Sequence, residues 1–288
     1  MEQVDYKELK KGGFMRQVQP DHFSMRLRVV GGQIKSEQLR AVSEISQKYG
    51  QGYVHMTSRQ GIEIPYIKLQ DIETAKQELA QAGLQTGACG ARVRTITACQ
   101  GSTICPSGLI DTTALAGILD EKYFARDLPH KFKFGITGCR NNCLKAEEND
   151  LGIKGGLKPN WDADKCIYCG LCEAVCPTQV INVNQDEQQL KFEESGCNYC
   201  GRCVKSCPTD AWEGKSGFIV SFGGLFGNQI SVGRQILPII FSEQELMWVV
   251  DTTLNFFEKH GKAGERFGKT LERVGWDLLE KELQEVLQ

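Results

Sequence analysis

The segments TACQGSTICPSG (residues 97–108) and TGCRNNCLKAEENDLGIKGG (residues 137–156) decide the fold, because each carries a closely spaced pair of cysteines. The two pairs are Cys99-x5-Cys105 and Cys139-x3-Cys143. These spacings do not fit a structural zinc site, and disulfide frameworks are typical of short secreted chains, whereas this chain has 288 residues. We therefore interpret these cysteines as thiolate ligands in a reducing cytoplasm.

The overall composition sets further limits. The thirteen cysteines divide into three sets of four plus Cys89, which we expect to be a small buried residue. A net charge of −2 gives no indication of nucleic-acid or membrane-surface binding. The charged N-terminus does not resemble a signal peptide, and the apolar stretch ILPIIF (residues 236–241) is too short to span a bilayer. We expect a cytoplasmic protein.

Residues 1–157 alternate between strand and helix signals. FSMRLRVV (residues 23–30) alternates apolar and polar residues like a half-buried strand, and GYVHMT and IEIPYI predict two more strands. Helices are predicted from Ser36, as N-cap, to Tyr49, and again after Asp71. This β-α-β-β-α order predicts an α+β unit with helices on one face of a sheet.

Residues 214–288 return to a strand followed by helices. GFIVSF (residues 217–222) predicts the strand, and Ser242 with Glu245 forms a capping box that opens a helix ending before Gly261. The tail from residue 265 to 288 also predicts helix. The core-facing stripe of the first helix comprises Leu246, Val249, Val250, Leu254 and Phe257.

The middle block, residues 158–213, contains an internal repeat. Each copy reads Cys-x2-Cys-x2-Cys-x3-Cys-Pro, the run of bacterial ferredoxins in which the fourth cysteine binds the other cluster. The alternative is a pair of structural zinc sites, whose ligand spacing differs. The repeat predicts one [4Fe-4S] cluster on Cys166, Cys169, Cys172 and Cys207, and a second on Cys176, Cys197, Cys200 and Cys203.

Pairs of cations occur two residues apart on three segments that we expect to be strands, and such residues share one strand face. The pairs are Arg26 with Arg28, Arg92 with Arg94, and Lys131 with Lys133. The intervening Leu27, Val93 and Phe132 point the other way, as they would on a sheet whose charged face is either a binding surface or simply solvated.

The cysteine pairs and the motif PHKFKF around Lys131 resemble the nitrite/sulfite reductase family with siroheme and a [4Fe-4S] cluster. The resemblance extends to its short, ferredoxin-containing type, such as the catalytic subunit of anaerobic sulfite reductases. It implies an α+β half-repeat fold with an inserted two-cluster ferredoxin domain. The implied domains are a ferredoxin-like half-domain (1–84), a siroheme/[4Fe-4S] domain (85–157 and 214–288) and the insert (158–213).

The resemblance also implies roles for individual residues. Cys99, Cys105, Cys139 and Cys143 would bind the coupled [4Fe-4S] cluster, with Cys143 bridging to the siroheme iron. Arg59, in TSRQG, matches an arginine that binds siroheme carboxylates. Substrate would meet four catalytic cations: Lys131 and Lys133 as acids and anion binders, and Arg26 and Arg94 as anion clamps.

One departure from the family pattern lies in the bridging motif. Arg140 and Asn142 stand where many relatives have proline and a small residue. The chain also corresponds to a single repeat, so the resemblance implies a partner: a second copy or a heteromeric reductase complex. Because no GxGxxG motif is present, we expect electrons to arrive from a ferredoxin or an electron-input subunit through the insert.

The implied function is reduction of sulfite to sulfide with six electrons. Two alternatives remain open. One is a siroheme nitrite reductase that makes ammonia, because the same cations suit either anion. The other is a non-catalytic electron-transfer subunit with three clusters and no siroheme, although a protein that only transfers electrons needs no anion-binding cations.

Overall fold

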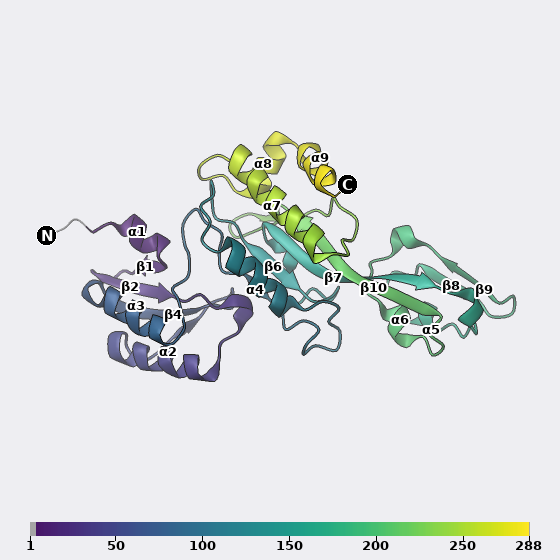
Figure 1. Ribbon diagram of the computed structural model, residues 1–288, viewed down its shortest axis with the longest axis horizontal. Coiled ribbons are helices and arrows are strands. Elements are labelled where there is room, and N and C mark those ends of the chain that lie inside the picture. Colours follow the sequence, from purple (N-terminus) through teal and green to yellow (C-terminus); the bar gives the residue numbers. More distant parts are fainter. Residues whose placement is uncertain (1–3, 288) are drawn as a thin grey trace.

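The computed structural model describes residues 4–287, and two four-stranded sheets organise most of them (Figure 1). The first sheet is antiparallel with strand order β1-β2-β4-β3, and helices α2 (Ser36–Tyr49) and α3 (Ile72–Gln81) cover one of its faces. Its strands are β1 (Phe14–Arg16), β2 (His22–Arg26), β3 (His55–Met56) and β4 (Ile62–Lys68).

The α+β arrangement predicted for this part is confirmed, with three differences in detail. Helix α1 (Tyr6–Lys11) and strand β1 were not predicted. The N-cap of α2 is Lys35, one residue before the predicted Ser36. The predicted strand over residues 23–30 ends at Arg26, because the backbone then turns to make isolated bonds with the segment around Gln85 and Thr86.

The second sheet has the order β10-β7-β6-β5 and mixes two kinds of pairing. Strand β5 (Thr97–Ala98) is parallel to β6 (Phe134–Thr137), which is parallel to β7 (Leu151–Trp161); β7 is antiparallel to β10 (Trp212–Phe222). Parallel neighbours have their carboxyl ends at the same edge. The loops that follow β5 and β6 therefore meet.

Helices pack around this sheet and form its core (Figure 1). They are α4 (Thr112–Tyr123), α7 (Glu243–His260), α8 (Phe267–Val274) and α9 (Trp276–Val286). The capping box of α7 is confirmed, since Ser242 Oγ accepts a hydrogen bond from Glu245 N at 3.1 Å. The predicted apolar stripe of this helix is fully buried. A short hairpin, β11 (Leu225–Phe226) and β12 (Ile230–Ser231), follows β10.

A cysteine-rich lobe lies at the far ends of β7 and β10, which stay paired over eleven residues each (Figure 1). It contains helices α5 (Leu171–Ala174) and α6 (Arg202–Ser206) and the hairpin β8 (Ile181–Asn184) and β9 (Gln189–Phe192). Its small core includes Trp161 and Trp212. The two long strands cross both boundaries of the predicted insert. This lobe is therefore continuous with the central sheet and is not joined to it by a linker.

Arg26 ends the regular strand β2 as predicted, but the segments that carry the other two cation pairs are not the regular strands that were predicted. Arg92 and Val93 make only isolated bridges, the latter to Phe132, and β6 begins one residue after Lys133. The apolar members of the pattern, Leu27, Val93 and Phe132, are nevertheless buried as expected. None of the helices described is long and apolar enough to cross a membrane.

The aromatic cluster behind the cations should dominate the stability of the central part. The buried ring of Phe257 lies 5.9 Å from that of Phe132 and 5.4 Å from that of Phe267. We expect Phe257→Ala to lower the free energy of unfolding by about 3–5 kcal/mol in denaturant titrations, because it leaves a cavity. Trp248→Ala, on the same helix but 44% exposed, is the matched control and should cost much less.

Candidate functional site

A cavity of about 240 Å³, partly open to solvent, lies between the N-terminal sheet and the central sheet. All five cations that the sequence assigned to substrate or siroheme line it: Arg26, Arg59, Arg94, Lys131 and Lys133. Among the described residues, no aspartate or glutamate contributes to its lining. So much positive charge without a counter-charge makes the cavity suited to an anionic occupant.

Arg26, the last residue of β2, enters the cavity from the N-terminal sheet. Its Nε donates to Glu63 Oε1 at 2.7 Å on the neighbouring strand β4, and its Nη1 contacts Cys89 Sγ at 3.0 Å. Burial opposes its charge, but Cys89 and Glu63 together raise the pKa of Arg26. Cys89 is buried as expected. It also contacts Arg26 in the cavity, and no sequence motif predicted this contact.

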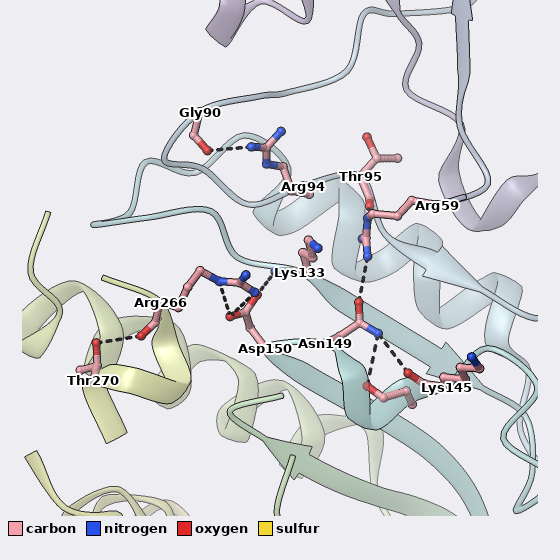
Figure 2. Close-up of polar contacts among 11 residues, drawn as sticks. Arg59, Gly90, Arg94, Thr95, Lys133, Lys145, Asn149, Asp150, Arg266 and Thr270 are labelled. Carbon is pink, nitrogen blue, oxygen red and sulfur yellow. Dashed lines mark hydrogen bonds and ion pairs between the residues drawn. The ribbon is translucent and has the colours of Figure 1, made fainter. Parts of the chain in front are cut away.

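Arg94 and Arg59 are held largely by neutral acceptors. Arg94 donates to the carbonyl oxygens of Ala88 and Gly90, both at 3.0 Å, and its buried Nε has no hydrogen-bond partner among the described residues. Arg59 donates to Asn149 Oδ1 at 2.8 Å and to Thr95 O at 3.3 Å (Figure 2). Burial lowers the pKa of both arginines, that of Arg59 to about 10.

The two lysines stand on either side of buried Phe132. Burial and the neighbouring arginines lower the pKa of both, and that of Lys133 falls to about 8. Neither ammonium group forms an ion pair with any residue in the range 4–287. A lysine with a pKa near 8 holds its proton at neutral pH but releases it readily, as a general acid must.

The other two arginines of the predicted pairs lie outside the cavity. Arg28 pairs with buried Asp120 at 2.7 Å, and Arg92 pairs with exposed Asp127 at 2.7 Å. The geometry therefore gives no support for a binding role of either arginine in this cavity.

Two charged residues that the sequence did not single out lie next to the segment that carries Lys133 (Figure 2). Asp150 is fully buried just before β7, and Arg266 is the N-cap of α8. They form an ion pair at 2.8 Å across 116 residues of sequence. Only the fold brings them together, so no local pattern could have revealed the pair.

The first cysteine set gathers at the carboxyl edge of β5 and β6. Cys99 directly follows β5, and Cys139 lies two residues beyond β6. Gly138 N donates to Cys99 Sγ at 3.0 Å, and a Cβ on Gly138 would come within 3.0 Å of Gly101 Cα. Burial, together with nearby Cys99, Cys105 and Cys143, raises the pKa of the Cys139 thiol, so the other three predicted ligands lie in its neighbourhood.

The eight cysteines of the outer lobe form two sets in separate cavities. One cavity is lined by Cys166, Cys169, Cys172 and Cys207, and the other by Cys176, Cys197, Cys200 and Cys203. Each set thus contains three cysteines of one run and the fourth of the other, as the repeat predicts. No three His, Cys, Asp or Glu side chains within residues 4–287 converge on a single metal ion, whereas mononuclear zinc sites require this.

The unusual residues of the bridging motif have structural partners. Asn142, with φ of 52°, accepts a hydrogen bond from Ala146 N at 2.9 Å and donates to Glu147, which also pairs with Lys154. Asn142 therefore closes the turn that follows Cys143. Arg140 lines a cleft that also contains Cys139 and Cys200, one from each of two cysteine sets.

Comparisons with known proteins agree with this arrangement. The family described as "Nitrite/Sulfite reductase ferredoxin-like half domain" matches residues 15–82. The F420-dependent sulfite reductase of Methanocaldococcus jannaschii is 33% identical over 96% of this chain and 44% of that protein. A subunit of the anaerobic sulfite reductase of Salmonella typhimurium is 34% identical over 52% of this chain and 48% of that protein. The chain thus spans less than half of either relative.

The fold also has a solved counterpart. Dissimilatory sulfite reductase I superposes with a TM-score of 0.74 at 21% identity, covering 91% of this chain and 69% of that one. The family described as "Nitrite and sulphite reductase 4Fe-4S domain" matches residues 89–288, which include the first cysteine set and the lysine pair. The chain therefore belongs to the nitrite and sulphite reductase family.

Proposed function

We propose that this oxidoreductase is a siroheme-dependent sulfite reductase that reduces sulfite to sulfide with electrons entering through the cysteine-rich lobe. The cation-lined cavity is the observation that carries the proposal, because a buried, unpartnered Arg94 Nε beside four other cations is costly without an anion. One relative that matches nearly the whole chain is a sulfite reductase by name, which favours sulfite over nitrite.

The residues present fit siroheme and a coupled [4Fe-4S] cluster. Arg59, which lines the cavity, would hold a siroheme carboxylate, and Cys99, Cys105, Cys139 and Cys143 would hold the cluster. When bound, these groups supply electrons and the iron site at which the substrate is reduced. The two outer cysteine sets would hold two further [4Fe-4S] clusters, giving three in all.

The protein itself binds the anion and delivers protons. Reduction of sulfite follows SO₃²⁻ + 6e⁻ + 7H⁺ → HS⁻ + 3H₂O, so proton supply matters as much as electron supply. Arg26 and Arg94 keep their charge and clamp the oxyanion. Lys133, with a lowered pKa, and Lys131 bind the anion and donate protons as its oxygens leave as water.

Contacts between the lobes support an electron path from the outer lobe inward. Cys200, from the second set, and Cys139, from the first, line one cleft. Lys205 Nζ, on α6, donates to Pro106 O at 2.8 Å, next to Cys105. The cluster on Cys176, Cys197, Cys200 and Cys203 would therefore pass electrons to the first cysteine set. It would receive them from the cluster on Cys166, Cys169, Cys172 and Cys207. A ferredoxin or electron-input subunit would be the donor, and a second copy or a heteromeric complex would complete the enzyme.

Turnover and optical spectra of anaerobically purified protein test the proposal. With a low-potential reductant, we expect sulfide from sulfite, a siroheme absorption band, and slower ammonia production from nitrite. Faster ammonia production would assign the same site to nitrite reduction. Absence of both siroheme and turnover would reduce the chain to an electron carrier.

Loss of either lysine should abolish most of the chemistry but leave the cofactors in place. We expect Lys131→Ala and Lys133→Ala each to lower kcat by about 100-fold or more, the usual contribution of a general acid, with an unchanged visible spectrum. Arg92→Ala removes a cation that pairs with Asp127 outside the cavity and should stay near wild type. Full activity in both lysine variants would refute the assignment.

The pH profile should report the protonation state of Lys133. Because Lys133 acts in its protonated form and burial lowers its pKa to about 8, kcat should fall as pH rises through this value. Lys133→Arg keeps the positive charge at all accessible pH values but donates protons poorly. We expect this variant to show a low kcat, nearly unchanged KM for sulfite, and no fall near pH 8. A wild-type profile in the variant would contradict the role.

The bridging role of Cys143 is tested by comparing two single-atom changes. Cys143→Ser should alter the siroheme band and the coupled cluster's electron paramagnetic resonance signal together. Cys169→Ser, in the outer lobe, should remove or alter a different cluster and leave the siroheme band intact. Loss of only one of the two signals in Cys143→Ser would contradict a shared ligand.

A further inference from the structure

Asp150 is the one carboxylate among the described residues that reaches the cation cluster from behind the cavity wall (Figure 2). It is fully buried. Its Oδ2 accepts hydrogen bonds from Lys133 N at 2.9 Å and from Arg266 Nη2 at 2.8 Å, and its Oδ1 accepts from Arg266 Nε and Nη2 at 3.3 and 3.0 Å. Asp150 thus ties helix α8 to the segment that carries the catalytic lysines.

The charge around Asp150 is strongly unbalanced. The charged groups that act on the Lys133 ammonium are Arg59 from the loop after β3, Lys131, Arg266 from α8, and Asp150 itself. Arg26 and Arg94 complete the cavity lining. Arg26 has its own ion pair with Glu63, so the other five cations share one fully buried carboxylate. Removing this carboxylate would leave the repulsion among those five largely uncompensated in a low-dielectric setting.

We propose that Asp150 is a positioning residue of the anion site, whose negative charge keeps the Lys133 ammonium charged among the surrounding cations and whose carboxylate fixes Arg266 and the Lys133 backbone. Arg266 contributes to this positioning, because its positive charge keeps Asp150 ionised. The inference deepens the proposed function but is testable without turnover.

The direction of each pKa change at Asp150 and Lys133 follows from the charges around it. Burial raises the pKa of Asp150, and the bidentate Arg266 opposes that rise, so the ion pair favours the carboxylate form. The negative charge of Asp150 raises the pKa of Lys133, whereas Arg266 lowers it. Removing Asp150 alone should therefore lower the pKa of Lys133, and removing both members of the pair should leave it close to the wild-type value.

Chemical labelling of lysine amines measures the pKa of Lys133 directly. Acetic anhydride reacts only with neutral amines, so the rate for each lysine, followed by mass spectrometry of its peptide over pH 6–10, gives its pKa. For Asp150→Asn, a one-unit fall from a pKa near 8 would speed Lys133 labelling about fivefold at pH 7. We expect this increase in Asp150→Asn and its loss in the double variant Asp150→Asn/Arg266→Gln. Exposed Lys281, on α9, is the internal reference.

Unchanged Lys133 labelling in a folded Asp150→Asn variant would overturn the proposal, as would equal acceleration at Lys281. If Asp150→Asn does not fold, the comparison is between the double variant and Arg266→Gln alone. The proposal requires faster labelling of Lys133 in the double variant, and equal labelling rates would overturn the proposal. A purely structural role would lower activity at all pH values without moving the Lys133 titration. Because labelling needs neither sulfite nor electrons, a predicted shift without sulfide production would refute the proposed function alone.

Discussion

The parallel pairing of β5 with β6, and of β6 with β7, determines where Arg94, the two lysines and the first cysteine set lie. Arg94 and Lys133 precede β5 and β6, and Cys99 and Cys139 follow them. Because the strands run the same way, the cations gather at one edge and the thiols at the other. The strands are only two and four residues long, so substrate-binding and cluster-binding groups lie within a few residues of each other.

The crossover from β6 to β7 links these two edges. It leaves the thiol edge at Cys139 and Cys143 and returns to the cation edge, where Asn149 holds Arg59 and Asp150 holds Arg266. One short segment therefore carries two of the proposed cluster ligands and the residues that hold Arg59 and Arg266. The arrangement concentrates positive charge in a cavity whose only nearby buried carboxylate is Asp150 among the residues described, which makes the site strongly selective for anions.

Local sequence predicted the parts of this site that depend on spacing. The cysteine runs and the helix from Ser242 follow short-range patterns, whereas the five cavity cations were chosen from the resemblance to a known family. The sequence could not show that Arg28 and Arg92 turn to distant acids, because both would satisfy a two-residue strand periodicity. Nor could it reveal the pair of Asp150 and Arg266, since its members are brought together only when α8 packs against the central sheet.

An anaerobic crystal structure of the protein with sulfite, recorded at the iron absorption edge, would test the account most directly. We expect iron at the three cysteine sets and siroheme in the cavity. We also expect sulfite oxygens within hydrogen-bonding distance of Lys131, Lys133 and Arg94. A cavity without a tetrapyrrole, or sulfite bound away from these cations, would contradict it.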